Sequence, residues 1–282
     1  MHRRELITSA TLASAGLMLA AAPPAQAQGA PEASNFNKIR DAGVLRVAVM
    51  RAQEPYYHKD LATNAWSGAC VDMANDIARV MRVKPDLVET ANWNTNVLDL
   101  QSGKVDLIFG VSPTPERALV FDLPSPVFMN FYTIVGKQGF PKVAHWEEIN
   151  KPEITVAVDL GSGQEAIAKR VLSKAQIKSF RDHDEMLLAV STGKLDCCLM
   201  AILLAMKATS KVPNLGAYSV PRPFLAAASC MAVRIDTDKR FRDFLSAWAT
   251  YNRSTGMIRE WVGKGLTAMG IDPSTIPPEV EI

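Results

Sequence analysis

The chain has 282 residues, 48% hydrophobic and 21% charged, a balance typical of a globular protein large enough for two ordinary domains. Its 31 Lys and Arg residues against 29 Asp and Glu give a formal net charge of +2, with no long run of either sign. The even charge argues against a partner such as nucleic acid, and the longest apolar run beyond the N-terminal region, residues 199–206, is far too short to span a bilayer.

The first 27 residues have the three parts of an export signal. Arg3 and Arg4 supply a charged start, residues 6–22 are mildly apolar, and Ala-Gln-Ala at 25–27 forms a cleavage site. We predict cleavage after Ala27 and a mature chain in the periplasm. The paired arginines favour the twin-arginine route, but general secretory signals can also begin in this way, so both routes stay open.

Strands and helices alternate along the mature chain. Short apolar runs predict strands at 44–50, 87–88, 105–109, 130–135, 154–158, 177–180, 195–199 and 226–233. Apolar residues at helical spacing and helix-stop signals predict helices at 72–83, 94–102, 164–172 and 184–191, and a long helical region at 242–261. Residues 110–117 have loop chemistry and lead into a short helical turn. The alternation predicts two α/β units with parallel sheets covered on both faces and long strands between them.

The four cysteines are Cys70, Cys197, Cys198 and Cys230. Cys197 and Cys198 are neighbours in an apolar strand, where their side chains point to opposite faces, so we expect buried free thiols there. A disulfide between Cys70 and Cys230 is the one pairing that we consider for an oxidising compartment. The histidines at 2, 58, 145 and 183 lack metal-ligand spacing, and the sequence predicts neither a metal site nor a cofactor.

Several short motifs follow one another in a recognisable order. They are Pro55-Tyr56, Gly68 with Asp72, and the segments 101–108, 114–117, 121–122, 156–162, 193–196 and 231–234. No single motif is specific, but their order and spacing over residues 38–265 resemble the type II periplasmic solute-binding proteins of polar amino acid ABC transporters (bacterial extracellular solute-binding proteins, family 3).

The resemblance implies an α/β, two-lobed periplasmic binding protein type II fold. One lobe would comprise residues 38–131 and 232–282, and the other residues 136–226, with two crossover strands near 131–136 and 226–232 acting as hinges. It implies a monomer that captures a small carboxylate-bearing solute, an amino acid or an organic acid, by cleft closure. Its partner would be an inner-membrane ABC permease.

The resemblance also implies a ligand site. Arg117 occupies the position where the family clamps a carboxylate with a guanidinium, a bidentate match. Ser112 matches a hydroxyl donor to the same carboxylate, Gly110 a backbone contact, and Ser162-Gly163 a helix start that favours an anion. The expected wall residues are Met50, Gln53, Tyr56 and Trp93.

One departure from the family pattern concerns the amino group. Ala201 stands where the amino acid binders carry an aspartate for the α-ammonium. Either another acid, such as Glu54, supplies the charge, or the ligand is not an α-amino acid; we favour an organic acid without a cationic amine, because a buried unpaired ammonium is costly. The alternative function is a periplasmic dehydratase of the prephenate or arogenate type on the same fold. That chemistry needs a general acid, for which Glu54 is the candidate.

Overall fold

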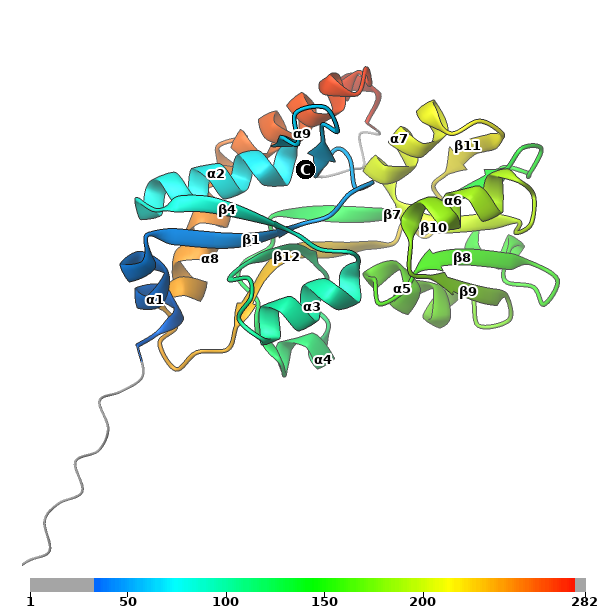
Figure 1. Ribbon diagram of the computed structural model, residues 1–282. Helices are drawn as coiled ribbons and strands as arrows, with labels where there is room; N and C mark the ends of the chain where they lie inside the picture. The colour runs from blue at the N-terminus through cyan, green and yellow to red at the C-terminus, as the bar shows by residue number, and fades with distance from the viewer. Residues whose placement is uncertain (1–32, 277–282) are drawn as a thin grey trace, which may run out of the picture. The chain divides into compact units, whose positions relative to one another are not determined.

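The structure is a computed structural model that describes residues 33–276 (Figure 1). The predicted export signal and its cleavage site after Ala27 lie outside these described residues. Within residues 33–276 no helix has the length and apolar character needed to cross a membrane.

The strands form two small pairs and one larger mixed sheet. The small pairs are β1 (Val44–Val49) with β4 (Lys84–Glu89), which run parallel, and the antiparallel β2 (His58–Lys59) with β3 (Trp66–Ser67). The larger sheet follows the order β5-β12-β7-β10-β8-β9, with β6 against β12 and β11 against β7. Its members are β5 (Ile108–Val111), β6 (Phe121–Asp122), β7 (Phe128–Lys137), β8 (Thr155–Asp159), β9 (Gln176–Phe180), β10 (Cys197–Ala201), β11 (Leu215–Ser219) and β12 (Ala226–Arg234).

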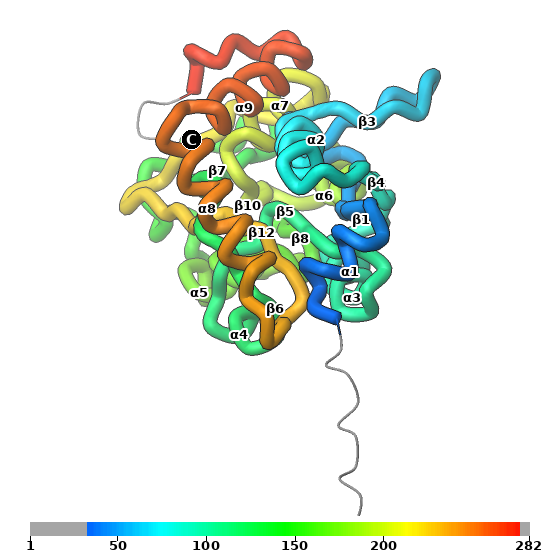
Figure 2. Tube along the Cα trace, turned by 90° about the vertical axis from the view of Figure 1, so that its left-hand side faces the viewer, coloured from blue at the N-terminus to red at the C-terminus, as the bar shows by residue number. Residues whose placement is uncertain are grey.

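The helices pack around these strands (Figure 1). They are α1 (Asn35–Ala42), α2 (Ala69–Met81), α3 (Trp93–Gln101), α4 (Pro115–Ala118), α5 (Gly163–Val171), α6 (His183–Ser191), α7 (Ile202–Lys211), α8 (Arg240–Ser254) and α9 (Met257–Ala268). The start and the end of the described chain pack together, since Phe36 of α1 lies with its ring centroid 6.5 Å from that of Phe241 in α8. Helices α2 and α9 also lie side by side (Figure 2).

Two long strands, β7 and β12, link elements that are distant in sequence. The first half of β7 pairs with β12, from Phe128 with Ser229 to Phe131 with Ala226. The second half pairs with β10, from Tyr132 with Ala201 onward, and also with β11. The expected parallel pairing is found between β1 and β4 and between β8 and its neighbours β9 and β10, but the pairings of the linking strands are antiparallel, so the larger sheet is mixed and not parallel throughout. The reason is that both linking strands run against their neighbours.

Three predicted boundaries differ from the structure for local reasons. The strand expected to end at Gly136 continues through it, because Gly136 pairs with Cys197 and a Cβ there would lie 2.4 Å from the Phe140 Cβ; this glycine serves close packing. The helical region at 242–261 is divided by Gly256, which has a φ of +84°. The apolar run 199–206 is shared between the end of β10 and α7, a helix that the sequence analysis missed.

The residues of β10 separate two cores. Cys198 and Met200 belong to the larger apolar core, whereas Cys197 and Leu199 belong to a second core on the other face of the strand. The prediction that Cys197 and Cys198 are buried free thiols is confirmed, and Cys70 and Cys230 are likewise buried and unpaired. Ala201, the last residue of the strand, belongs to the larger core.

Candidate functional site

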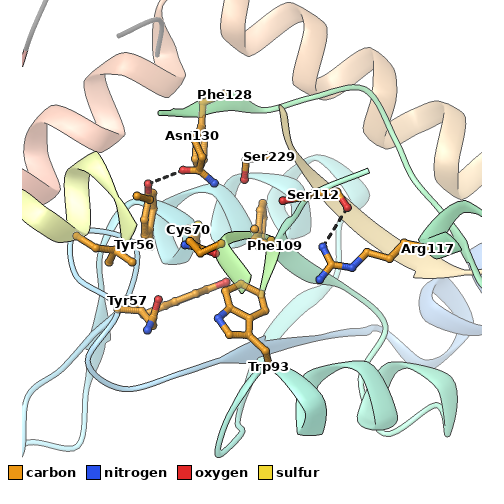
Figure 3. A pocket seen from close by; sticks show the side chains of 16 residues that line it. Tyr56, Tyr57, Cys70, Trp93, Phe109, Ser112, Arg117, Phe128, Asn130 and Ser229 are labelled. Atoms are coloured by element: carbon orange, nitrogen blue, oxygen red, sulfur yellow. Dashed lines mark hydrogen bonds between the residues drawn. The ribbon is translucent and has the colours of Figure 1, made fainter. Parts of the chain in front are cut away.

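A partly open cavity lies between the ends of β5 and β10, the start of β7 and the middle of β12 (Figure 3). Concave pockets at the ends of sheet strands are common small-molecule sites. Eight of the residues expected at a ligand site line it: Gln53, Tyr56, Trp93, Gly110, Ser112, Arg117, Gly163 and Ala201. The other lining residues are Tyr57, Cys70, Phe109, Phe128, Asn130, Gln164, Leu204 and Ser229.

Arg117 is held where two loops meet. Thr114 caps the start of its short helix α4, and the Thr114 hydroxyl accepts a hydrogen bond from the Arg117 backbone N–H at 3.3 Å. The Arg117 Nη1 donates to the Ser112 carbonyl at 3.1 Å, and Nη2 donates to the Gly161 carbonyl at 2.9 Å. The guanidinium thus joins the loop after β5 to the loop after β8.

The Arg117 charge has no counter-ion among residues 33–276. Burial lowers the pKa of Arg117, yet an arginine stays protonated in a protein, so the cation persists. Both of its hydrogen-bond partners are neutral carbonyls, and only two of its five N–H groups are engaged by them. The remaining donors can receive an anion.

Glycines allow the loops to approach one another closely. A Cβ on Gly163 would lie 2.3 Å from the Ser112 Oγ, and a Cβ on Gly110 would lie 2.7 Å from the Trp93 ring. Gly110 also has a φ of +82°, in the left-handed region that glycine adopts readily. Side chains at these two positions would push the walls of the cavity apart.

The other titratable groups of the cavity are neutral. Burial raises the pKa of both Tyr56 and Tyr57, and it raises the pKa of the Cys70 thiol to about 12. None of the lining residues is a carboxylate. At neutral pH the lining therefore carries one charge, the positive charge of Arg117, so it attracts an anion and has no partner for a buried cation.

Glu54 lies outside this cavity, although it was the candidate acid. Its carboxylate is 3.2 Å from the His58 Nδ1 and forms an ion pair with the Lys207 Nζ at 3.2 Å, and it lines two neighbouring cavities instead. Burial would raise the pKa of Glu54, but the Lys207 charge and hydrogen bonds outweigh it, so the pKa is lowered. An ionised, paired carboxylate on the outside supplies neither an ammonium partner nor a general acid to the cavity.

Two other residues expected at the site are used elsewhere. The Ser162 hydroxyl donates to the Asp159 carbonyl at 2.7 Å and accepts from the Glu165 N–H at 3.1 Å, so it caps α5. The Ser-x-x-Glu spacing was itself a signal for such a cap. The Met50 Sδ accepts from the Asn96 side chain at 3.3 Å and faces a neighbouring cavity.

The sequence analysis missed Asn130 and Ser229. Both lie in strands that were recognised only as apolar runs, on β7 and β12. The available signal was a polar side chain inside an otherwise apolar strand, because a buried polar group needs a partner.

The mixed sheet with two shared long strands, and the cavity at the strand ends, define a type II periplasmic binding protein. The sequence profile of the bacterial extracellular solute-binding proteins, family 3, matches residues 45–269. The chain belongs to this family, as its motifs predicted.

Similar proteins include both binders and an enzyme. The cyclohexadienyl dehydratase of Pseudomonas aeruginosa is 26% identical over 236 residues, covering 80% of this chain and 84% of that protein. An amino acid ABC transporter substrate-binding protein from Streptococcus pneumoniae, bound to L-arginine, has a TM-score of 0.74 and 26% identity over 83% of this chain and 98% of that one. An ancestral amino acid-binding protein, a precursor of cyclohexadienyl dehydratase, has a TM-score of 0.71 and 27% identity over 82% of this chain and 99% of that one.

Proposed function

We propose that this chain is the periplasmic substrate-binding component of an ABC importer and that it captures a small carboxylate-bearing solute. Family membership supports solute binding, and the transporter proteins among the similar structures support an ABC permease as the partner. The observation that supports a carboxylate ligand is Arg117, a half-buried guanidinium on the cavity wall whose hydrogen-bond partners are neutral carbonyls. In this proposal the protein works as a monomer, and its exported form begins at Gln28, which mass spectrometry of the periplasmic chain would check.

The proposed mechanism is closure of two lobes on the ligand. One lobe comprises residues 38–131 and 232–282 and the other residues 136–226, with β7 and β12 as hinges. Arg117 and Ser112 of the first lobe meet Gly161 and Gly163 of the second, and this contact supports a closed arrangement. A carboxylate between them would hydrogen-bond to both lobes and so favour closure.

The proposed solute has no cationic amine. Ala201, at the junction of β10 and α7, lines the cavity without a polar group, and no other lining residue is an acid. Burying an ammonium without a counter-ion costs several kcal/mol. The neighbour bound to L-arginine shows that the family accommodates amino acids, so the difference must lie in the residues of this cavity.

Calorimetric titration of matched pairs tests this proposal. Each pair would consist of an α-amino acid and the same acid without the amine, offered to chain that has been unfolded and refolded to remove bound solute. We expect the amine-free acid to bind at least tenfold more tightly in each pair that binds. Ala201→Asp should narrow or reverse that preference. Tighter binding of the amino acids throughout would contradict the proposal.

A dehydratase is the second candidate, favoured by the similarity to cyclohexadienyl dehydratase. Elimination chemistry needs a proton donor at the leaving group. The cavity has no carboxylic acid or histidine, its tyrosines and its thiol have raised pKa values and are weak acids at neutral pH, and Glu54 is ionised outside it. We therefore expect binding without turnover; loss of prephenate or arogenate above the uncatalysed rate, abolished in Arg117→Ala, would favour the enzyme.

A further inference from the structure

The part of the cavity formed by β7 and β12 carries polar groups that the carboxylate clamp does not use. Ser229 of β12 is paired with Phe128 of β7, and Asn130 lies two residues further along β7. Paired residues share one face of a sheet, and so do residues two apart in a strand. Phe128, Asn130 and Ser229 therefore face the same side, and Figure 3 shows them gathered on one wall of the cavity, with Arg117 on another.

Ser229 has an unmet hydrogen bond. Its side chain is 1% exposed, and its Oγ has no hydrogen-bond partner among the residues that the structure describes. The Ser229 backbone carbonyl, in contrast, is satisfied, because it accepts a hydrogen bond from the Val127 N–H at 2.8 Å. Buried hydroxyls in folded proteins are nearly always hydrogen-bonded. An unpartnered hydroxyl on the wall of a ligand cavity therefore indicates a polar group of the ligand beside it.

Asn130 is oriented to act with Ser229. Its Oδ1 accepts a hydrogen bond from the Tyr56 hydroxyl at 3.1 Å, and the Tyr56 ring is stacked on Phe128 with centroids 5.3 Å apart and planes 5° apart. In this arrangement the amide oxygen is engaged by the Tyr56 hydroxyl, so the Nδ2 donors are left to the cavity. The result is a hydroxyl and an amide N–H₂ on one wall, next to two stacked aromatic rings.

We propose that Ser229 and Asn130 form a second subsite, which hydrogen-bonds an uncharged oxygen of the solute, a ketone or a hydroxyl, away from its carboxylate. This inference rests on the proposed carboxylate-binding function. An uncharged acceptor is the group that fits, because both side chains offer donors but no positive charge, and a second carboxylate would be buried without a counter-ion. The solute is therefore an oxo or hydroxy monocarboxylate, with its carbon skeleton against Tyr56 and Phe128.

The test is a calorimetric comparison of oxygenated acids with their parent acids. The probes are pentanoate with 4-oxopentanoate and 4-hydroxypentanoate, hexanoate with 5-oxohexanoate, and 3-phenylpropanoate with 3-(4-hydroxyphenyl)propanoate. In the refolded wild-type protein we expect at least one oxygenated acid to bind about tenfold more tightly than its parent. The ratio of the two dissociation constants should fall close to one in Ser229→Ala, a change that removes the hydroxyl and little volume.

Two further variants make the result specific. Asn130→Asp replaces the donors by a carboxylate, so it should also lose the preference and instead favour 5-aminopentanoate over pentanoate. Ser254→Ala removes an exposed hydroxyl that bonds only the Tyr251 carbonyl, and it should leave the ratio unchanged. Thermal melting of each variant would check its fold.

The outcomes separate the subsite from the function on which it rests. Parent acids that bind in an Arg117-dependent manner, with no gain from any oxygen or with a gain that survives in Ser229→Ala, would overturn the subsite alone. Failure of every acid in the panel to bind would overturn the carboxylate function and the subsite with it. A gain that disappears in both Ser229→Ala and Asn130→Asp supports the assignment.

Discussion

Charged side chains are arranged differently inside the cavity and just outside it. The outer group, defined here as Glu54, His58, Lys207, Asp159 and His183, consists of ionisable side chains that pair with one another. Glu54 lies 3.2 Å from both His58 and Lys207, and the Asp159 carboxylate lies 2.9 Å from the His183 Nδ1. Inside the cavity, the Arg117 guanidinium hydrogen-bonds to two backbone carbonyls and forms no ion pair with any described residue.

The difference separates charges that serve structure from a charge that serves binding. A pair within the chain is satisfied whether or not a ligand is present, so it contributes to folding and little to affinity. A buried charge without a counter-ion in the chain is satisfied best when an anion arrives. If this comparison is right, substitutions inside the cavity change affinity, and substitutions in the outer group change stability.

The largest effect is expected at Arg117. Removing one half of a buried, hydrogen-bonded charge pair costs roughly 2–5 kcal/mol, so Arg117→Ala should weaken carboxylate binding roughly 30-fold to several-thousand-fold at about 1.4 kcal/mol per decade. Arg117→Lys keeps the charge but loses the bidentate fork, so its affinity should lie between those of the wild type and Arg117→Ala.

Titration with the tightest acid of the panel measures this, and circular dichroism checks the fold. Arg51→Ala is the matched control, because Arg51 is an exposed arginine that pairs with Glu89 outside the cavity. Binding by Arg117→Ala within threefold of wild type would remove Arg117 from the site.

A smaller effect is expected from Gly163→Ala. Gly163 is not in the left-handed region, so alanine fits the backbone, but its Cβ would lie 2.3 Å from the Ser112 Oγ. Overpacking of this kind costs roughly 1–3 kcal/mol, which corresponds to roughly 5- to 150-fold weaker binding if closure brings the two loops together. Gly263→Ala has more room, with its nearest neighbour 3.6 Å away, and should bind as wild type does. Equal affinity in both variants would mean that the two loops do not meet in the bound state.

Glu54→Gln examines the outer group. The amide cannot hold the ion pair with Lys207, and because both side chains are largely buried, the free energy of unfolding should fall by roughly 1–3 kcal/mol. Carboxylate affinity should stay within threefold of wild type, because Glu54 does not line the cavity. Urea unfolding and titration give the two quantities. A tenfold loss of affinity at unchanged stability would place the Glu54 carboxylate in contact with the ligand.

The smallest effect concerns His183 and pH. Burial opposes protonation of the imidazole, but the Asp159 carboxylate outweighs burial and raises the pKa of His183. A raised folded-state pKa means that the protonated pair contributes stability below the unfolded-state value of about 6.5, and that this contribution disappears as the pH rises through the folded-state pKa. The stability difference between wild type and His183→Gln should therefore shrink with rising pH. A difference that grew with pH would show that the buried imidazole is neutral.

Much of this arrangement was predictable from local sequence. Hydrophobic periodicity and turn residues located β1, β8, β9 and α6 to within a few residues, because each of these elements depends on residues that are neighbours along the chain. The motif around Arg117 placed it in the cavity together with Ser112 and Gly110, because Gly110 in β5, Ser112 just after it and Arg117 in α4 are close neighbours along the chain. Family membership and the type II fold followed from the order of such motifs.

Other features depend on residues that are far apart in sequence, and only the tertiary structure decided them. Ser229 and Asn130 come together because β12 pairs antiparallel with β7, a register that no local pattern encodes. The Glu54 carboxylate lies outside the site, where it pairs with Lys207 of α7, a residue more than 150 positions away in the sequence. Ser162 illustrates the same limit at short range, since one hydroxyl could cap a helix or meet a ligand, and packing of its loop selected the cap. Sequence thus determined which chemical groups are available, whereas long-range pairing determined which of them remain unsatisfied and face the cavity.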